Sequence, residues 1–286
     1  MGSNPYLQGA AVTFQTSRPS DLPDFKNPPL VECALGVQFE TPSGYHQIHA
    51  GQVWEKFKLD YPEVQTVEPL PPTFEVFGVA GAGQQLGAQI QFTSGVVHPR
   101  YWFCSSDRQQ LIQFQNDRLL FNWRKVGLDT PYPRYESLKS KFAACSSQVE
   151  LALRELSLGP SLCVNQCEIT YINQVRFEDF ESTSASRLFS FLQFSDASPD
   201  DFACTFRHVV NDAGGRPYAR LTCEVVPLFQ SDGRPLIQLS LVFRGRPKTP
   251  TLESSLEFFD AGRSEIVRRF TSMTTSAAHA IWGRTQ

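Results

Sequence analysis

The segment Arg100–Lys125 constrains the fold of this chain most, because it predicts consecutive antiparallel strands. Turn-forming clusters lie at 105–107 (Ser-Ser-Asp) and at 116–117 (Asn-Asp). Between and after them are two runs rich in aromatic and branched residues, 109–115 and 118–124. Runs of this kind separated by short turns are typical of neighbouring strands, and they leave no room for a helix between them. A β-sheet is therefore the expected scaffold.

The composition indicates a folded protein that is neither strongly basic nor membrane-spanning. Hydrophobic residues make up 41% of the 286 positions and charged residues 19%, which is typical of a globular protein and not of a disordered one. The formal net charge of -3 supplies no general attraction to nucleic acid or anionic membranes. Without an apolar run of about 18 residues or a secretory leader, we expect a cytoplasmic protein with no membrane contact. Seven cysteines at irregular spacing indicate reduced thiols.

The chain divides into an N-terminal arm, 1–25, and two halves, 26–160 and 161–286. The arm has little hydrophobic periodicity, which favours a mobile or surface-draped segment. In the first half, apolar residues alternate with polar or small ones over Leu30–Glu40, which predicts a half-buried strand. A helix over His46–Tyr61 is expected to lie across the sheet.

The first half continues with short elements and ends in a long helix. The segments before the strand block are a rigid proline-rich connection, a short strand, a glycine-rich loop and a further strand, at 69–72, 73–79, 78–87 and 88–93. From Tyr135 onward, apolar residues recur at spacings of three and four, which predicts an amphipathic helix of about 24 residues. The pair Gly159-Pro160 is expected to close it.

The second half repeats this order of elements. Its expected strands are 162–177, 202–210, 216–229 and 235–244, with a short helix over 184–194 after the first and a long helix from Leu252 to Ile281 at the end. We interpret the repetition as an internal duplication. The spacing of Glu32 and Gln38 on the first strand matches that of Glu168 and Gln174.

Several short motifs resemble a sporadically distributed family of uncharacterised prokaryotic proteins of about 250–290 residues. The motifs are Asn-Pro-Pro-Leu-Val-Glu at 27–32, Ser-x-Asp at 105–107 before Gln-Phe-Gln at 113–115, Asn-Trp at 122–123, Tyr-Ile-Asn at 171–173 and Trp-Gly-Arg at 282–284. The resemblance covers about residues 26–284. It implies no catalytic residues, because none are assigned in the family. The patchy distribution is similar to that of mobile defence or toxin-antitoxin genes.

The expected fold is α+β, with two similar halves that each pack helices on one face of an antiparallel sheet. This architecture is similar to the duplicated saddle of TATA-binding proteins and, less closely, to helix-grip domains. Such an analogy cannot assign a function.

No motif in the sequence specifies an enzyme, a metal site or a cofactor. The glycine-rich loop lacks the third glycine and the helix of a dinucleotide site, and neither the pair Cys163/Cys167 nor the pair His46/His49 has the further ligands that zinc needs. Weak catalytic candidates are Glu32, Glu168 and Tyr171, because two first-strand carboxylates could meet between the halves. The alternative is that both carboxylates pair with arginines on the polar sheet face.

Polar side chains on the strands form the candidate binding surface. They are Gln113, Gln115, Asn122, Arg124, Asn173, Gln174, Arg220, Gln238 and Arg244. Hydrogen-bonding groups on rigid strands lose little entropy on binding, although solvent exposure alone also produces such a face. Our first hypothesis is a non-enzymatic binding or regulatory protein that recognises a partner protein. The alternatives are an enzyme with an acidic site between the halves and a single-stranded nucleic-acid-binding saddle.

Overall fold

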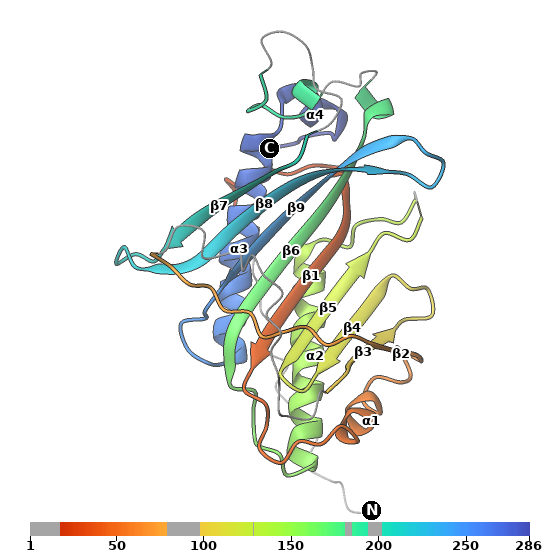
Figure 1. Cartoon of the computed structure of the whole chain (residues 1–286), viewed down its shortest axis with the longest axis vertical. Coiled ribbons are helices and arrows are strands. Elements are labelled where there is room, and N and C mark those ends of the chain that lie inside the picture. The colour runs from red at the N-terminus through yellow and green to blue at the C-terminus, as the bar shows by residue number, and fades with distance from the viewer. Residues whose placement is uncertain (1–17, 79–97, 128, 181–184, 194–201) are drawn as a thin grey trace, which may run out of the picture.

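A computed structural model describes residues 18–78, 98–127, 129–180, 185–193 and 202–286. Its fold is α+β, as expected, with one large antiparallel sheet and helices (Figure 1). In their order across the sheet, the nine strands of the described residues are β2 (Glu63–Val67), β3 (Arg100–Cys104), β4 (Gln110–Gln115), β5 (Arg118–Arg124), β1 (Leu30–Phe39), β6 (Val164–Arg176), β9 (Pro235–Gly245), β8 (Pro217–Phe229) and β7 (Cys204–Asn211).

The centre of the sheet is the antiparallel pair β1 and β6, in which Cys33 lies opposite Tyr171. The predicted alternation of β1 is confirmed from Cys33 to Phe39, whose odd-numbered residues belong to the core, but an irregularity between Leu30 and Glu32 places Leu30 in the core instead of Val31. Gly36 points to the other face of the sheet, where a side chain would not fit without a shift: an added Cβ would lie 2.9 Å from Leu120 Cγ. The strand block of the sequence forms β3, β4 and β5, so the segment that predicted a sheet does supply three neighbouring strands.

Two long helices, α2 (Tyr135–Glu155) and α3 (Leu252–Met273), cover one face of the sheet (Figure 1). Phe142 of α2 and Phe259 of α3 meet edge to face, with 5.1 Å between ring centroids, and both are fully buried. At Gly262 the helix approaches the sheet so closely that an added Cβ would lie 2.5 Å from Ile169 Cγ2. The helices therefore bury the apolar face of the sheet and leave its polar face uncovered by helix.

The final helix is shorter than the apolar stripe predicted, because it stops at Met273 and a separate helix α4 (Ser276–Ile281) follows. Thr274 and Thr275 between them are extended, and the Thr275 hydroxyl caps α4 by accepting from the Ala278 amide at 3.2 Å. A threonine cap competes with helix continuation, and the stripe alone does not show this.

Other predicted helices are also shorter. Helix α1 spans only His49–Trp54, and short 3-10 turns, η1 (Phe177–Phe180) and η2 (Ala185–Arg187), lie near the helix expected over 184–194. Residues 73–78, the described part of the expected strand 73–79, do not form a strand of the sheet. Instead β2 forms earlier, and 68–78 runs extended without joining a ladder. Most of the glycine-rich loop and the strand 88–93 lie outside the described residues.

The described part of the N-terminal arm is packed. Leu22 is fully buried, and Phe25 forms an isolated β-bridge with Arg284. Among the described residues, no helix has the length and apolarity needed to cross a membrane.

Candidate functional site

The polar face of the sheet carries an extended segment of the same chain, residues 68–78, which we call the strap. Figure 1 shows it in orange, crossing in front of β5, β1 and β6 toward the far end of β8. The strap is not a strand of the sheet. Side chains of the polar face bind its backbone instead, and the contacts below follow it from its first residue to its last.

The first part of the strap is held by β3 and β4. Arg100 Nε donates to the Glu68 carbonyl at 3.2 Å. Gln115 bonds both backbone groups of Leu70: its Oε1 accepts from the amide at 2.9 Å and its Nε2 donates to the carbonyl at 3.0 Å. One primary amide thus satisfies a donor and an acceptor on the same residue, as a neighbouring strand would.

The middle of the strap lies over β5, β1 and β6. Arg118 donates to the Pro71 carbonyl at 2.9 Å, and Gln38 Oε1 accepts from the Thr73 amide at 3.0 Å. The side-chain amide of Gln166 is oriented so that its nitrogen donates to the Asn165 carbonyl. Its oxygen then accepts a hydrogen bond from the Glu75 backbone amide at 3.1 Å. Burial beneath the strap lowers the pKa of Arg118, although the nearby Asp117 opposes this shift. The guanidinium still carries its charge at neutral pH.

The far end of the strap is held by charge. Glu75 lies 2.7 Å from Arg220 Nε and 3.7 Å from Arg244 Nη1, and the Glu75 and Arg220 side chains are each only 11% exposed. Arg220 also donates to the Val76 carbonyl at 2.6 Å and lies over the Phe77 ring. Because this carboxylate is so little exposed, its interaction with two guanidiniums stabilises the strap more than a solvent-exposed ion pair would.

The strap alternates in exposure as a strand does. Thr73, Glu75 and Phe77 turn toward the sheet, whereas Phe74 is 47% exposed and Val76 is 52% exposed. The contacts described above therefore involve the strap backbone, the Glu75 carboxylate and the Phe77 ring, and the two outward apolar side chains have little part in holding the segment.

The strap does not fill the site. A hollow of about 330 Å³ lies between it and the middle of the sheet, lined by Gly36, Gln38, Arg118, Glu168 and Arg244 among others. At the junction of β1 and β5, the Leu120 side chain lies over Gly36, which has no side chain of its own, and forms part of the floor of this hollow.

A separate polar network occupies the β3–β5 end of the same face. The Gln113 amide donates to Asn122 Oδ1 at 2.9 Å, and Asn122 donates to Glu32 Oε1 at 2.6 Å. Arg124 lies 3.6 Å from Glu32, too long for a hydrogen bond, and over the Trp102 ring at 5.0 Å. Among the described residues, Arg124 Nε is buried without a hydrogen-bond partner. The network touches the strap only indirectly, through Arg100, which donates to Gln113 Oε1 at 2.7 Å.

The candidate carboxylates do not meet. Glu32 lies opposite Ile172 and Glu168 opposite Gly36, so four positions separate them along the β1–β6 ladder, about 13 Å at the usual rise per residue. Glu168 pairs with Arg244, in line with the arginine alternative of the sequence analysis, and Glu32 faces Arg124. The third candidate, Tyr171, is on the opposite face of the sheet.

The predicted binding residues thus fall into groups. Gln115 and Arg220 hold the strap backbone, and Arg244 faces the strap carboxylate. Gln174 and Gln238 hydrogen-bond each other at 3.2 Å on the second half of the face. Asn173 faces the helices instead, where it donates to the Leu239 carbonyl.

Sequence reasoning missed the strap and four residues that hold it: Gln38, Arg100, Arg118 and Gln166. The only signal was the pair of prolines at 71–72 followed by the alternating run 73–77, which we interpreted as a connection and a strand. Proline lacks a backbone donor, so a proline-rich extended segment is better suited to side-chain contacts than to a sheet ladder.

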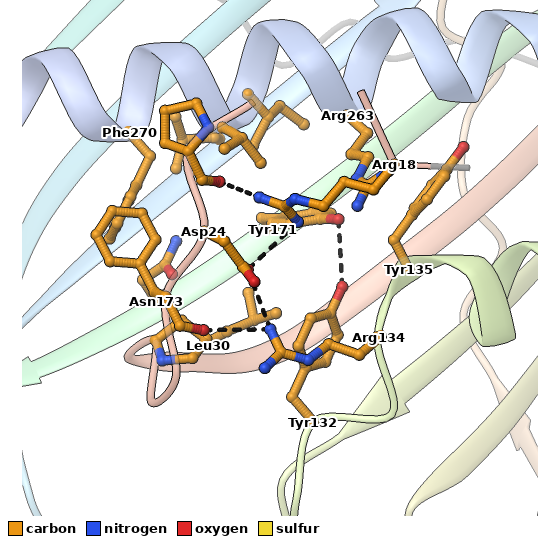
Figure 2. Close-up of a pocket in the computed structure, with 16 residues that line it drawn as sticks. Arg18, Asp24, Leu30, Tyr132, Arg134, Tyr135, Tyr171, Asn173, Arg263 and Phe270 are labelled. Carbon is orange, nitrogen blue, oxygen red and sulfur yellow. Dashed lines mark hydrogen bonds and ion pairs between the residues drawn. The ribbon is translucent and has the colours of Figure 1, made fainter. Parts of the chain in front are cut away.

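The helix side of the sheet contains a partly open pocket beside Tyr171 (Figure 2). Its walls come from β1, β6, β9, the start of α2, the middle of α3 and residues 18–28. Tyr171 and Tyr132 meet there through their hydroxyls at 3.3 Å. Burial raises the pKa of both phenols, so both stay protonated at neutral pH.

Within the described parts of the chain, no group of three or more His, Cys, Asp or Glu side chains is placed to hold a metal ion. All seven cysteines are free. No family model matches the chain, and searches of curated proteins and of solved structures found no match.

Proposed function

We propose that this protein binds a partner protein by holding an extended segment of it on the polar face of the sheet, in the place that the strap occupies in the structure. One observation carries the proposal: the polar face binds the strap chiefly through its backbone groups and one carboxylate, and Phe77 is the one strap ring described in contact with it. A surface that binds backbone groups can accept other sequences in the same extended conformation.

The strap then has a regulatory role, because it competes with the partner for the same side chains. A tethered segment acts at an effective concentration of the order of millimolar, so a free peptide must bind more tightly or the strap must be released first. The hollow beneath the strap offers the partner contacts that the strap lacks. The partner segment that fits best is extended, with an acidic residue for Arg220 and Arg244.

The element order supports the proposed internal duplication. Each central strand pairs with the last strand of its own half, β1 with β5 and β6 with β9, and a long helix follows each of these, α2 and α3. If the two halves are related in this way, the strap crosses the junction between them. The polar face of the sheet is then the surface to compare with the saddle of TATA-binding proteins. A cytoplasmic location and a role in a mobile defence or toxin-antitoxin system stay predictions.

The other two hypotheses have less support. An acidic catalytic site needs carboxylates close together, and about 13 Å separates Glu32 from Glu168 at the usual rise per residue. For single-stranded nucleic acid, Trp102 beside Arg100 and Arg124 would be the stacking element. However, Arg220 and Arg244 already face carboxylates, and the net charge of -3 disfavours a polyanion.

A peptide added in trans tests the proposal. In the Glu75→Arg protein, the new cation would face Arg220 and Arg244, so the strap should leave the polar face. A labelled synthetic peptide with the natural sequence of residues 68–78 should then bind this variant, with fluorescence anisotropy as the readout. It should bind the natural protein far more weakly, because the tethered strap holds the site.

A matched control is Glu68→Arg, which makes the same charge change at an exposed strap residue. The strap should stay in place in this variant, and the peptide should bind it no better than the natural protein. Absence of saturable binding to the folded Glu75→Arg protein would contradict the proposal. Affinity capture from the source cell with the Glu75→Arg protein, with and without Arg220→Ala, should then identify partners that depend on the polar face.

A further inference from the structure

The pocket of Figure 2 lies on the other side of the sheet from the strap and has the features of a small-molecule site. Its cavity volume is about 60 Å³, below the range of typical ligand sites, so a ligand of this kind enters only when residues 18–25 move. The inner wall is apolar and comes from Leu30, Leu241, Ile266 and Phe270. It lies at the centre of the molecule, where β1 and β6 meet under α3.

The mouth of the pocket holds two arginines and one carboxylate. Arg18 and Arg134 both lie 3.3 Å from the same oxygen, Asp24 Oδ1 (Figure 2). Two cations thus share one acid. The Arg18 Nε is buried and has no hydrogen-bond partner among the described residues, so this guanidinium keeps an unused donor.

The charges behind the pocket are already matched. Arg263 lies 2.9 Å from Glu136 and over the Tyr135 ring, and Lys139 lies 2.6 Å from Asp260. These pairs cannot supply the missing negative charge at the mouth. The excess positive charge at the mouth is therefore that of Arg18 and Arg134, whose guanidiniums also donate to backbone carbonyls of Leu22, Pro23 and Phe25.

The inner end of the pocket can donate a hydrogen bond. Tyr132 and Tyr171 share one bond between their hydroxyls, which uses only one of the two protons. Both phenols are protonated at neutral pH. The Cys33 thiol is a hydrogen-bonding neighbour of Tyr171, so an acceptor on a ligand competes with that thiol for the second proton.

The geometry points to a binding site for a small carboxylic acid with an apolar body. Its carboxylate takes the place of Asp24 between Arg18 and Arg134, and its body lies against Leu30, Ile266 and Phe270. The arginines recognise the carboxylate by charge-assisted hydrogen bonds. An acceptor at the far end of the body reaches the tyrosine pair. Residues 18–25 act as the cover that moves when the ligand enters.

Benzoate and 4-hydroxybenzoate are suitable probes. The controls are benzyl alcohol, which lacks the carboxylate, and inorganic phosphate, which lacks the apolar body. The full chain is titrated with each compound by isothermal calorimetry, and ligand-observed NMR detects weak binding. Both carboxylates should bind at one site, and both controls should bind at least tenfold more weakly.

Three substitutions separate this site from a purely structural cluster. Asp24→Asn removes the competing carboxylate, so benzoate should bind at least threefold more tightly, although the loss of two ion pairs lowers the melting temperature. Arg134→Gly removes a guanidinium at a residue with φ 71°, ψ 153°, a conformation that glycine adopts without strain. This variant should stay folded and bind benzoate at least tenfold more weakly.

The third substitution, Tyr171→Phe, should weaken 4-hydroxybenzoate more than benzoate. Arg216→Gln, in a distant hairpin, is the matched control for the loss of an arginine and should change nothing. The inference is overturned if neither carboxylate binds the folded Asp24→Asn protein at millimolar concentration, or if Asp24→Asn weakens benzoate binding as Arg134→Gly does.

Discussion

The Glu75→Gln substitution measures how strongly charge holds the strap on the sheet. Glutamine keeps the shape of the side chain but removes the charge that faces Arg220 at 2.7 Å and Arg244 at 3.7 Å. Arg244 keeps its pair with Glu168, and Arg220 keeps its bond to the Val76 carbonyl. The loss is therefore that of one carboxylate, and neither arginine becomes wholly unpaired.

The magnitude follows from these contacts. A hydrogen bond to a charged group contributes about 1.5–3 kcal/mol when its surroundings are partly buried, as the 11% exposure of both Glu75 and Arg220 indicates here. Since each 1.4 kcal/mol is about tenfold in an equilibrium constant, strap opening should become about 10- to 100-fold more frequent.

Native-state hydrogen exchange is the assay, because it reports local opening separately from global unfolding. The amides of Leu70, Thr73 and Glu75 should lose protection by this factor, and those of the β1–β6 ladder should not. The melting temperature should change little, because Phe74 and Val76 of the strap are largely exposed. Glu68→Gln is the control and should leave all of these amides unchanged.

Unchanged protection of the three strap amides in Glu75→Gln would refute the reasoning. An equal loss of protection across the strap and the β1–β6 ladder would refute it as well, because the strap would then be an integral part of the folded core. Either outcome would also remove the regulatory role proposed for the strap.

Three further predictions concern other parts of the fold. Gln115→Leu removes both bonds to Leu70 and should raise exchange of that amide by about tenfold, seen by the same method. Gly262→Ala should lower the free energy of unfolding by about 1–3 kcal/mol in urea denaturation, because its Cβ meets Ile169. Burial and Arg284 lower the pKa of His279, so the folded state binds fewer protons than the unfolded state. The stability of the fold should therefore decrease as the pH drops through about 6.5. In His279→Gln this decrease should be smaller, as measured by thermal melts between pH 5 and 8.

The sequence by itself determined the class of fold and most of its strands. Short-range patterns were enough where a segment has only one way to bury its apolar residues, as in β1 and in the run from Arg100 to Arg124. Helix ends were less predictable, because the apolar stripe continues past Met273, whereas the caps at Thr274 and Thr275 depend on local competition for backbone bonds.

Only the tertiary structure decided which polar residues act together. Gln115 lies on β4 and Arg220 on β8, with four strands between them in the sheet, and they share a ligand only because the strap crosses those strands. The same holds for Glu32 and Glu168, whose matching positions in sequence suggested a meeting. The register of β1 against β6 keeps them apart, because it is set by packing on the helix face and not by the polar residues themselves.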